Sequence, residues 1–256
     1  MSLVKTEIRD RVAVVRLDDP GRRNAISLAM AEELDATFAR LDSSGDAGAV
    51  VVTGTPPAFS AGADLADLEA ADRERLRRIY AGFLAVARCP WPTIAAVNGA
   101  AVGAGLNLAL ACDVRIAARS ARFESRFLDL ALHPGGGHTW MFRRILGPQG
   151  ATAAVLLGES LDGEEAVRRN LAWRCVADDE VVEAARELAS RAAGAPPGLV
   201  RRLKQTIRGM EGVAEHSDAV ELELEPQLWS IGQPEFRQQL ERIRARIAAK
   251  AKSRRS

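Results

Sequence analysis

A run of small and apolar residues between positions 93 and 113 constrains the fold of this chain more than any other stretch. Residues 93–97 (TIAAV) are apolar and β-prone, so they predict a short buried strand. Asn98 and Gly99 then turn the chain, and after residues 103–105 (GAG) an apolar helix is predicted to run to about Asp113. The first N–H groups of such a helix have no partner within it, and the helix dipole adds positive potential there. This arrangement favours an anion, or a carbonyl oxygen that becomes anionic in a reaction.

A second segment has the same character. Residues 49–54 (AVVVTG) predict another buried strand, and residues 56–65 (PPAFSAGADL) lead from it through small side chains to Asp64, near a predicted helix start. Two such turns could each offer one backbone N–H to the same oxygen, which is how an oxyanion hole is built from main chain alone. The plainer alternative is that both are only tight strand-to-helix turns.

Composition excludes several classes of protein. The 35 basic and 34 acidic residues give a net charge of +1, so no general field for nucleic acid or a membrane surface is expected. The three cysteines are unevenly spaced and have no histidine at metal-ligand spacing, which predicts reduced thiols and no metal site. No apolar run reaches transmembrane length and the first residues lack a signal pattern, so we expect a cytoplasmic protein without membrane insertion. No nucleotide or flavin cofactor is suggested.

The order of predicted elements indicates an α/β fold. Strands and helices alternate in the first half of the chain, whereas helices dominate after Gly135. Residues 196–198 (PPG) form the best internal boundary. We therefore expect a core over residues 1–195 and a helical region over residues 196–256.

Four segments together resemble one known family. Residues 59–65 (FSAGADL) and 94–105 (IAAVNGAAVGAG) look like the two signature segments of the crotonase superfamily, the enoyl-CoA hydratase/isomerase family. Residues 19–27 (DPGRRNAIS) resemble its CoA-binding stretch, and residues 157–166 resemble the segment leading into its C-terminal helices. The likeness covers roughly residues 5–245. It implies a core built as a crotonase-like ββα spiral and a C-terminal helical layer that assembles a homotrimer or a hexamer.

The resemblance also assigns binding residues. The backbone N–H groups of Ala63 and Ala104 would form the oxyanion hole. Ala104 stands where the family usually has glycine, and its methyl group is tolerable unless its φ is positive. A CoA thioester would be substrate or ligand rather than a cofactor, and Arg22 or Arg23 could meet a phosphate. The residues expected to line the CoA path are Arg23, Asn24, Ala25, Ala61, Asp64 and Leu65.

The acid/base residues depart from the family pattern. Asn107 stands where the first catalytic glutamate would be, and Phe127 stands where the second would be. Neither side chain can accept a proton near neutral pH, so ordinary two-glutamate hydration is not expected.

Three nearby residues are candidate replacement bases. Asp129 lies two positions beyond Phe127, so on an extended segment the two side chains would share a face. His133 and His138 flank a glycine-rich loop that the family places beside the thioester. A structural role in the core is the alternative for each histidine.

Two other mechanisms are not supported by the sequence. The glycine pattern of residues 99–105 has the wrong order for a dinucleotide fingerprint. A serine peptidase of the same broad fold would need a serine just after the glycine loop, where Leu106 and Asn107 stand, so no acyl-enzyme nucleophile is predicted.

These observations leave two hypotheses. One is a hydratase/isomerase-family enzyme of fatty-acid metabolism that uses a single base, which suits double-bond isomerisation better than water addition. The alternative is a non-catalytic protein that binds fatty-acyl-CoA. Phe127, Leu128 and Trp140 would suit a long acyl chain in either case, although core packing explains them equally well.

Overall fold

The computed structural model describes residues 2–253, and the side chains of residues 2–250. The chain divides into two compact units, Met1–Gly194 and Ala195–Ser256. The sequence had placed the boundary between residues 195 and 196. The last three residues of the predicted helical region, 254–256, lie outside the described residues.

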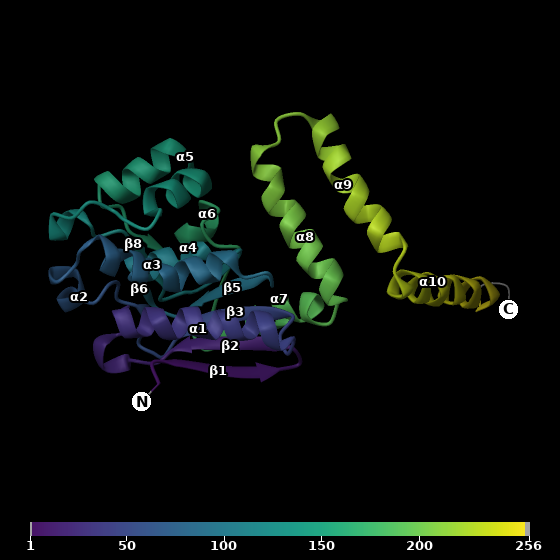
Figure 1. Cartoon of the computed structure of the whole chain (residues 1–256), viewed down its shortest axis with the longest axis horizontal. Helices are drawn as coiled ribbons and strands as arrows, with labels where there is room; N and C mark the ends of the chain where they lie inside the picture. Colours follow the sequence, from purple (N-terminus) through teal and green to yellow (C-terminus); the bar gives the residue numbers. More distant parts are fainter. Residues whose placement is uncertain (1, 254–256) are drawn as a thin grey trace. The chain divides into compact units, whose positions relative to one another are not determined.

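The core of the first unit is a six-stranded sheet with the order β1-β2-β3-β5-β7-β10, of which β1, β2, β3 and β5 are labelled in Figure 1. The first two strands are antiparallel, and all the following neighbours are parallel. Every residue of β3 is buried. The strands are β1 (Val4–Arg9), β2 (Val12–Leu17), β3 (Ala49–Gly54), β5 (Thr93–Val97), β7 (Val114–Ala118) and β10 (Arg174–Val176).

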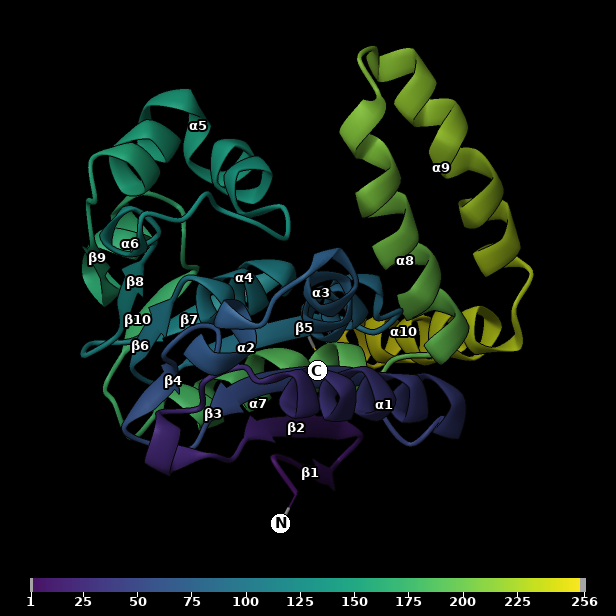
Figure 2. The same cartoon turned by 60° about the vertical axis from the view of Figure 1, so that its left-hand side comes forward.

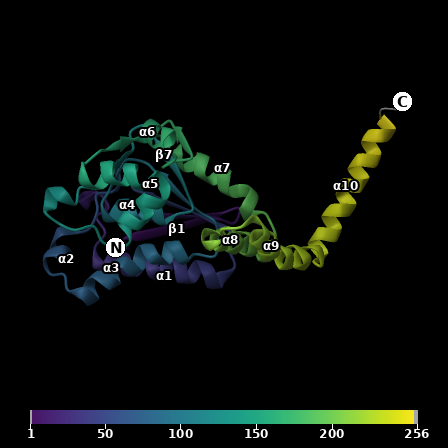
Figure 3. The same cartoon turned by 90° about the horizontal axis from the view of Figure 1, so that it is seen from above.

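Helices cover this sheet on both faces. Helix α7 (Val181–Ala193) packs on β2, β3, β5 and β7 through its buried Val181 and a row of alanines. Figure 3 shows α1 (Leu28–Ser44) and α3 (Arg73–Arg88) on the opposite side of the strands from α7. Ser27 caps α1 as its hydroxyl accepts a hydrogen bond from the Met30 N–H at 3.2 Å.

A second, four-stranded sheet carries the two signature segments, and it is best followed in Figure 2. Its order is β4-β6-β8-β9, in which β4, β6 and β8 are parallel and β9 is antiparallel to β8. Helix α2 (Leu65–Glu69) begins soon after β4, and α4 (Ala104–Ala111) begins soon after β6. The strands are β4 (Ala58–Ser60), β6 (Ala100–Val102), β8 (Arg122–Glu124) and β9 (Leu161–Asp162).

Two helices and two short 3-10 turns complete the first unit. Element α5 (His138–Leu156) consists of two helical segments that meet in a bend at Gly147, whose φ and ψ are not helical. The bend falls there because Gly147 has a φ of 70° and Pro148 follows it. The others are α6 (Gly163–Arg168), η1 (Pro20–Arg22) and η2 (Leu128–Leu130).

The second unit consists of helices in its described residues. Helices α8 and α9 pack against each other and α10 follows α9. Their bounds are α8 (Pro197–Gly209), η3 (Met210–Gly212), α9 (His216–Ile231) and α10 (Pro234–Ser253).

The predicted α/β class is confirmed, since mixed sheets and many helices make up the chain. Within residues 2–253, no helix is both long enough and apolar enough to cross a membrane.

Candidate active site

The two signature segments meet because their strands are neighbours. β4 pairs with β6 in parallel, with Ala58 opposite Ala100 and Ser60 opposite Ala101. The first turn of α4 then packs directly on the end of β4: a Cβ added to Gly105 would lie 2.6 Å from Ser60 Oγ. Only glycine permits this close approach. As a result, Ala63 and Ala104 line the same inner cavity.

Both predicted N–H donors are oriented so that the backbone itself does not use them. The Ile26 N–H donates to Gly62 O at 2.7 Å, and the Ile26 carbonyl oxygen accepts from the Asp64 N–H at 3.0 Å. In this parallel bridge Ala63, which lies between Gly62 and Asp64, has its own N–H directed away from Ile26. Ala104 is the first residue of α4, where N–H groups have no partner within the helix. The positive φ of this turn, 47°, falls on Gly103, so the methyl group of Ala104 is accommodated without strain.

The inner cavity has a volume of about 170 Å³ and mostly apolar walls from α2, α3 and the two signature segments. No aspartate or glutamate is among the described residues that line it. Tyr80 lines one side, and burial raises the pKa of its phenol. The other side chains that can donate or accept hydrogen bonds there are Asn107, Ser125, Arg126 and His133.

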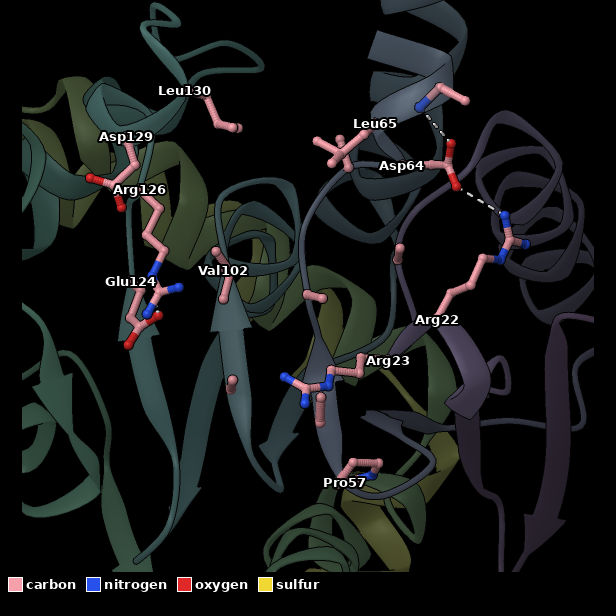
Figure 4. A pocket seen from close by; sticks show the side chains of 16 residues that line it. Arg22, Arg23, Pro57, Asp64, Leu65, Val102, Glu124, Arg126, Asp129 and Leu130 are labelled. Carbon is pink, nitrogen blue, oxygen red and sulfur yellow. Dashed lines mark hydrogen bonds and ion pairs between the residues drawn. The ribbon is translucent and has the colours of Figure 1, made fainter. Parts of the chain in front are cut away.

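An outer groove of about 900 Å³ adjoins the inner cavity, since Ala61, Ala63 and Leu65 line both (Figure 4). Arg23, Ala25, Ala61, Asp64 and Leu65, which were predicted to lie along a CoA path, all line this groove.

Asn24 was also predicted to lie along the CoA path, but it does not line the groove. Its side chain is fully buried, and its amide donates to Thr55 O and Ala58 O, each at 2.8 Å. Its carbonyl oxygen accepts from the Asp19 N–H at 3.0 Å. Asn24 has a φ of 56°, which turns the side chain inward under the groove, so it stabilises the loop and does not line the path.

Two arginines give the groove positive charge at one end. Arg22 is held between Asp19 at 2.7 Å and Asp64 at 2.9 Å, and the hydrogen bond to Asp19 contributes most to raising its pKa. Asp64 also caps α2, because its carboxylate accepts from the Ala66 and Asp67 N–H groups. Arg23 forms no ion pair with the other described residues, so its guanidinium is open to a ligand anion.

Asp129 was expected to share a face with Phe127 on an extended segment, and this expectation is wrong. The segment after Phe127 is the 3-10 helix η2 and not an extended strand, so side chains two positions apart do not share a face. Phe127 lines the inner cavity, whereas Asp129 lines the outer groove. In Figure 4, Leu65 and Leu130 point toward each other across the groove and the Asp129 carboxylate points away from them. Glu124 is also engaged elsewhere, in an ion pair with Arg126 at 2.7 Å.

The two candidate histidines have different surroundings. His133 is exposed, lines the inner cavity, and has its Nδ1 2.7 Å from Pro134 O. His138 is 1% exposed and, contrary to the prediction, does not line the cavity; its Nε2 lies directly behind the hydroxyl of Ser125, which does. Its ring packs against Phe127 and Phe142, with both centroid distances 4.7 Å. Burial lowers the pKa of His138 to about 4, so the ring is neutral at physiological pH.

His138 links two polar side chains of the cavity wall. Its Nδ1 lies 2.6 Å from Asn107 Oδ1, and its Nε2 lies 2.8 Å from Ser125 Oγ. Ser125 was not a candidate in the sequence because no motif surrounds it. It follows β8, some distance along the chain from the glycine loop where a nucleophile was sought. Only the packing of α4, α5 and the residues after β8 brings these three side chains together.

A further apolar space of about 600 Å³ lies beyond Phe127, which lines both this space and the inner cavity. Leu128 also lines it. Trp140 does not: it is 59% exposed, and the guanidinium of Arg144 stacks on its ring at 4.6 Å.

Comparisons with known proteins point to one family. Residues 7–233 match the family model described as enoyl-CoA hydratase/isomerase. The chain is 50% identical to a probable enoyl-CoA hydratase of Mycobacterium tuberculosis, over 91% of this chain and 94% of that protein. It is 30% identical to 4-chlorobenzoyl coenzyme A dehalogenase-2 of Arthrobacter, over 95% and 91%.

A solved structure from Thermobifida fusca, crystallised in complex with CoA, shares the fold. Its TM-score is 0.81 at 29% identity, over 90% of this chain and 93% of that one.

Proposed function

Because the chain belongs to the enoyl-CoA hydratase/isomerase family, we propose that it is an enzyme that binds an acyl-CoA thioester and polarises its carbonyl group. The observation that carries this proposal is the pair of N–H groups, from Ala63 and Ala104, on one small apolar cavity. Hydrogen-bond donors fixed in such a cavity stabilise negative charge on an oxygen more strongly than donors in water. An enolate or an oxyanion at the thioester carbonyl is therefore the intermediate that the site would favour.

The outer groove would hold the CoA moiety. Arg23 can pair with a phosphate without breaking an ion pair to another described residue, and Arg22 lines the same groove. The groove leads to the inner cavity through the shared wall of Ala61 and Ala63, so a thioester at the junction would place its oxygen beside the two N–H groups. The space beyond Phe127 would receive an acyl chain too long for the inner cavity. These features support a role in fatty-acid metabolism.

The acid/base chemistry differs from two-carboxylate hydration. Neither Asp129 nor Glu124 lines the inner cavity, and the amide of Asn107 is committed to His138 and to Gly135 O. Within the described residues, His133, Tyr80 and Ser125 are the cavity-lining groups that could exchange a proton. One such group suffices for moving a double bond, whereas addition of water requires the handling of two protons.

A non-catalytic acyl-CoA-binding protein is the second candidate. It is favoured by the lack of an aspartate or glutamate among the described residues around the inner cavity. Such a protein would use the same two N–H groups only to bind the thioester.

The second unit supports assembly into a homotrimer or hexamer. Only Val200 and Lys204 of its described side chains are buried, whereas α9 and α10 leave large apolar side chains exposed. Light scattering of the purified protein would measure the assembly directly, and a monomer would contradict it. The exposed side chains are Val220, Leu222, Leu224, Leu228, Ile231, Phe236, Ile243 and Ile247.

The test is an assay with crotonyl-CoA and longer enoyl-CoAs beside acyl-CoA binding by calorimetry. Turnover at roughly 1 s⁻¹ or faster supports the enzyme. Binding without turnover of any enoyl-CoA supports the non-catalytic protein. Failure to bind CoA thioesters contradicts both.

A further inference from the structure

Asn107, His138 and Ser125 form a continuous hydrogen-bonded chain that ends at the inner cavity. The Asn107 amide nitrogen donates to Gly135 O at 3.0 Å, which turns the amide oxygen toward His138 Nδ1 at 2.6 Å. An amide oxygen carries no proton, so Nδ1 must be the donor in this contact. In the neutral ring Nε2 is then an acceptor, and the Ser125 hydroxyl donates its proton to it at 2.8 Å. The network therefore fixes the tautomer that a general base requires.

Ser125 and Asn107 are the members of this network that line the inner cavity, and of the two only Ser125 has a hydroxyl that can act as a nucleophile. It lines the inner cavity together with Ala63, Ala104 and Gly103, although the side chain is nearly buried. Its backbone is close to the glycine loop, since Gly103 N donates to Glu124 O at 2.9 Å. A serine hydroxyl backed by a histidine, on the same cavity as two N–H donors, has the elements of nucleophilic acyl transfer.

We propose that Ser125, His138 and Asn107 are a nucleophilic triad that hydrolyses acyl-CoA thioesters to free coenzyme A and a carboxylic acid. The proposal depends on the acyl-CoA binding proposed above but not on any chemistry at a double bond. It extends the substrates to saturated acyl-CoAs, which can be neither hydrated nor isomerised.

The reaction balances with water as the only co-reactant. Ser125 Oγ attacks the thioester carbonyl carbon while its proton passes to His138 Nε2, and the N–H groups of Ala63 and Ala104 hold the oxyanion. The C–S bond then breaks, and the CoA sulfur takes the proton from His138 to leave as the thiol. Water next attacks the acyl ester, again giving its proton to Nε2. This step releases the carboxylic acid and returns Ser125 to its hydroxyl form.

The surroundings of His138 predict slow turnover. Phe127 and Phe142 pack against the ring, and burial keeps the ring neutral and able to accept a proton. Asn107 orients the ring but, unlike a carboxylate, carries no charge to stabilise the imidazolium. Asn107 is thus a positioning residue, and formation of the imidazolium limits the rate.

The primary experiment uses the full-length protein with hexanoyl-CoA and measures thiol release. We expect release above the uncatalysed rate and a loss of at least about 100-fold in Ser125→Ala, with Ser43→Ala as the control at an exposed serine. Intact-protein mass spectrometry should detect a hexanoyl adduct on the wild type but not on Ser125→Ala. Equal release by wild type and Ser125→Ala overturns the proposal.

Two further measurements guard against a variant that fails to fold. Labelling of the wild-type protein by a fluorophosphonate, with peptide mapping, should mark Ser125, and labelling elsewhere or nowhere overturns the triad. Calorimetry with hexanoyl-CoA separates the two proposals. Binding without thiol release or adduct overturns the triad alone, whereas no binding overturns the proposed function as well.

Asn107→Asp tests the positioning role. A carboxylate beside Nδ1 raises the pKa of His138 and stabilises its imidazolium. We expect the acid limb of the pH profile for thiol release to move to higher pH and the rate near neutral pH to rise. If Asn107 has only a structural role, Asn107→Asp should release thiol more slowly with the acid limb of the pH profile unchanged. That result overturns its role in the triad.

Discussion

The outer groove and the inner cavity adjoin each other but have opposite character. The groove has partly exposed charges that already pair with one another, such as Arg22 with Asp64 and Arg126 with Glu124. The cavity has mostly apolar walls, and two of its polar side chains, Asn107 and Ser125, are linked through His138 by buried hydrogen bonds. Exposed ion pairs contribute little energy and adapt easily to a ligand, whereas buried polar groups are costly to disturb. Affinity should therefore depend on the groove, and chemistry on the cavity.

The largest effect should come from removing one oxyanion donor. Ala104→Pro deletes its N–H at the first position of α4, where proline fits the helix. We expect kcat/KM with the active thioester to fall by about 10²–10³-fold while CoA affinity changes little. Ala104→Ser keeps the N–H and serves as the matched control. A folded proline variant with full activity would show that the Ala104 N–H does not bind the carbonyl oxygen.

The buried histidine should make stability depend on pH. His138 has a pKa of about 4 in the folded protein, whereas an unfolded histidine titrates near its ordinary value of about 6.5. Between these values the unfolded chain binds more protons, so the free energy of unfolding falls as pH is lowered from about 6.5 to about 4. The loss should be on the order of 3 kcal/mol and complete below pH 4.

Urea denaturation of His138→Gln and of the control His216→Gln, an exposed residue, would isolate this contribution. The difference in unfolding free energy between wild type and His138→Gln should shrink as pH falls. A difference that stays constant from pH 7 to pH 4 would show that His138 is not held neutral by burial.

A smaller effect, on CoA affinity, is expected from removing a cation of the outer groove. Arg23→Gln removes a cation from the CoA path and should weaken CoA binding by about three- to tenfold, on the order of 1 kcal/mol, with kcat unchanged. Calorimetry at two salt concentrations gives the measurement, because the wild-type advantage should shrink at high salt. Arg119→Gln is a control outside the groove. Unaltered affinity would mean that the CoA phosphates do not contact Arg23.

The smallest effect is expected for Asp129→Asn. Because Asp129 lines the groove and not the cavity, kcat should stay within about twofold of the wild type. A loss of 100-fold or more would restore Asp129 as the base and remove the distinction between groove and cavity.

The order of the elements and both signature turns could be predicted from the sequence because their causes are local. Buried strands show as apolar runs, and Ser27 and Asp64 mark helix starts by capping the N–H groups that follow them. That Ala63 and Ala104 line one cavity could also be predicted, since two similar strand-to-helix turns can each direct an N–H group to the same oxygen. The resemblance to a known family added the expectation that the ligand is a CoA thioester.

Which candidate side chains reach the inner cavity could not be predicted, because this depends on backbone geometry and on contacts between distant segments. Whether Asp129 shares a face with Phe127 depends on η2 being a 3-10 turn, and whether Asn24 lines the groove depends on its positive φ.

The sequence by itself indicated the α/β fold, the two strand-to-helix turns and the enoyl-CoA hydratase/isomerase family. Tertiary packing alone joined Asn107 on α4, His138 at the start of α5 and Ser125 after β8 into one network. A strand or a cap follows from neighbouring residues, whereas the partner of a buried polar group is chosen by whichever segment the fold brings within hydrogen-bonding distance.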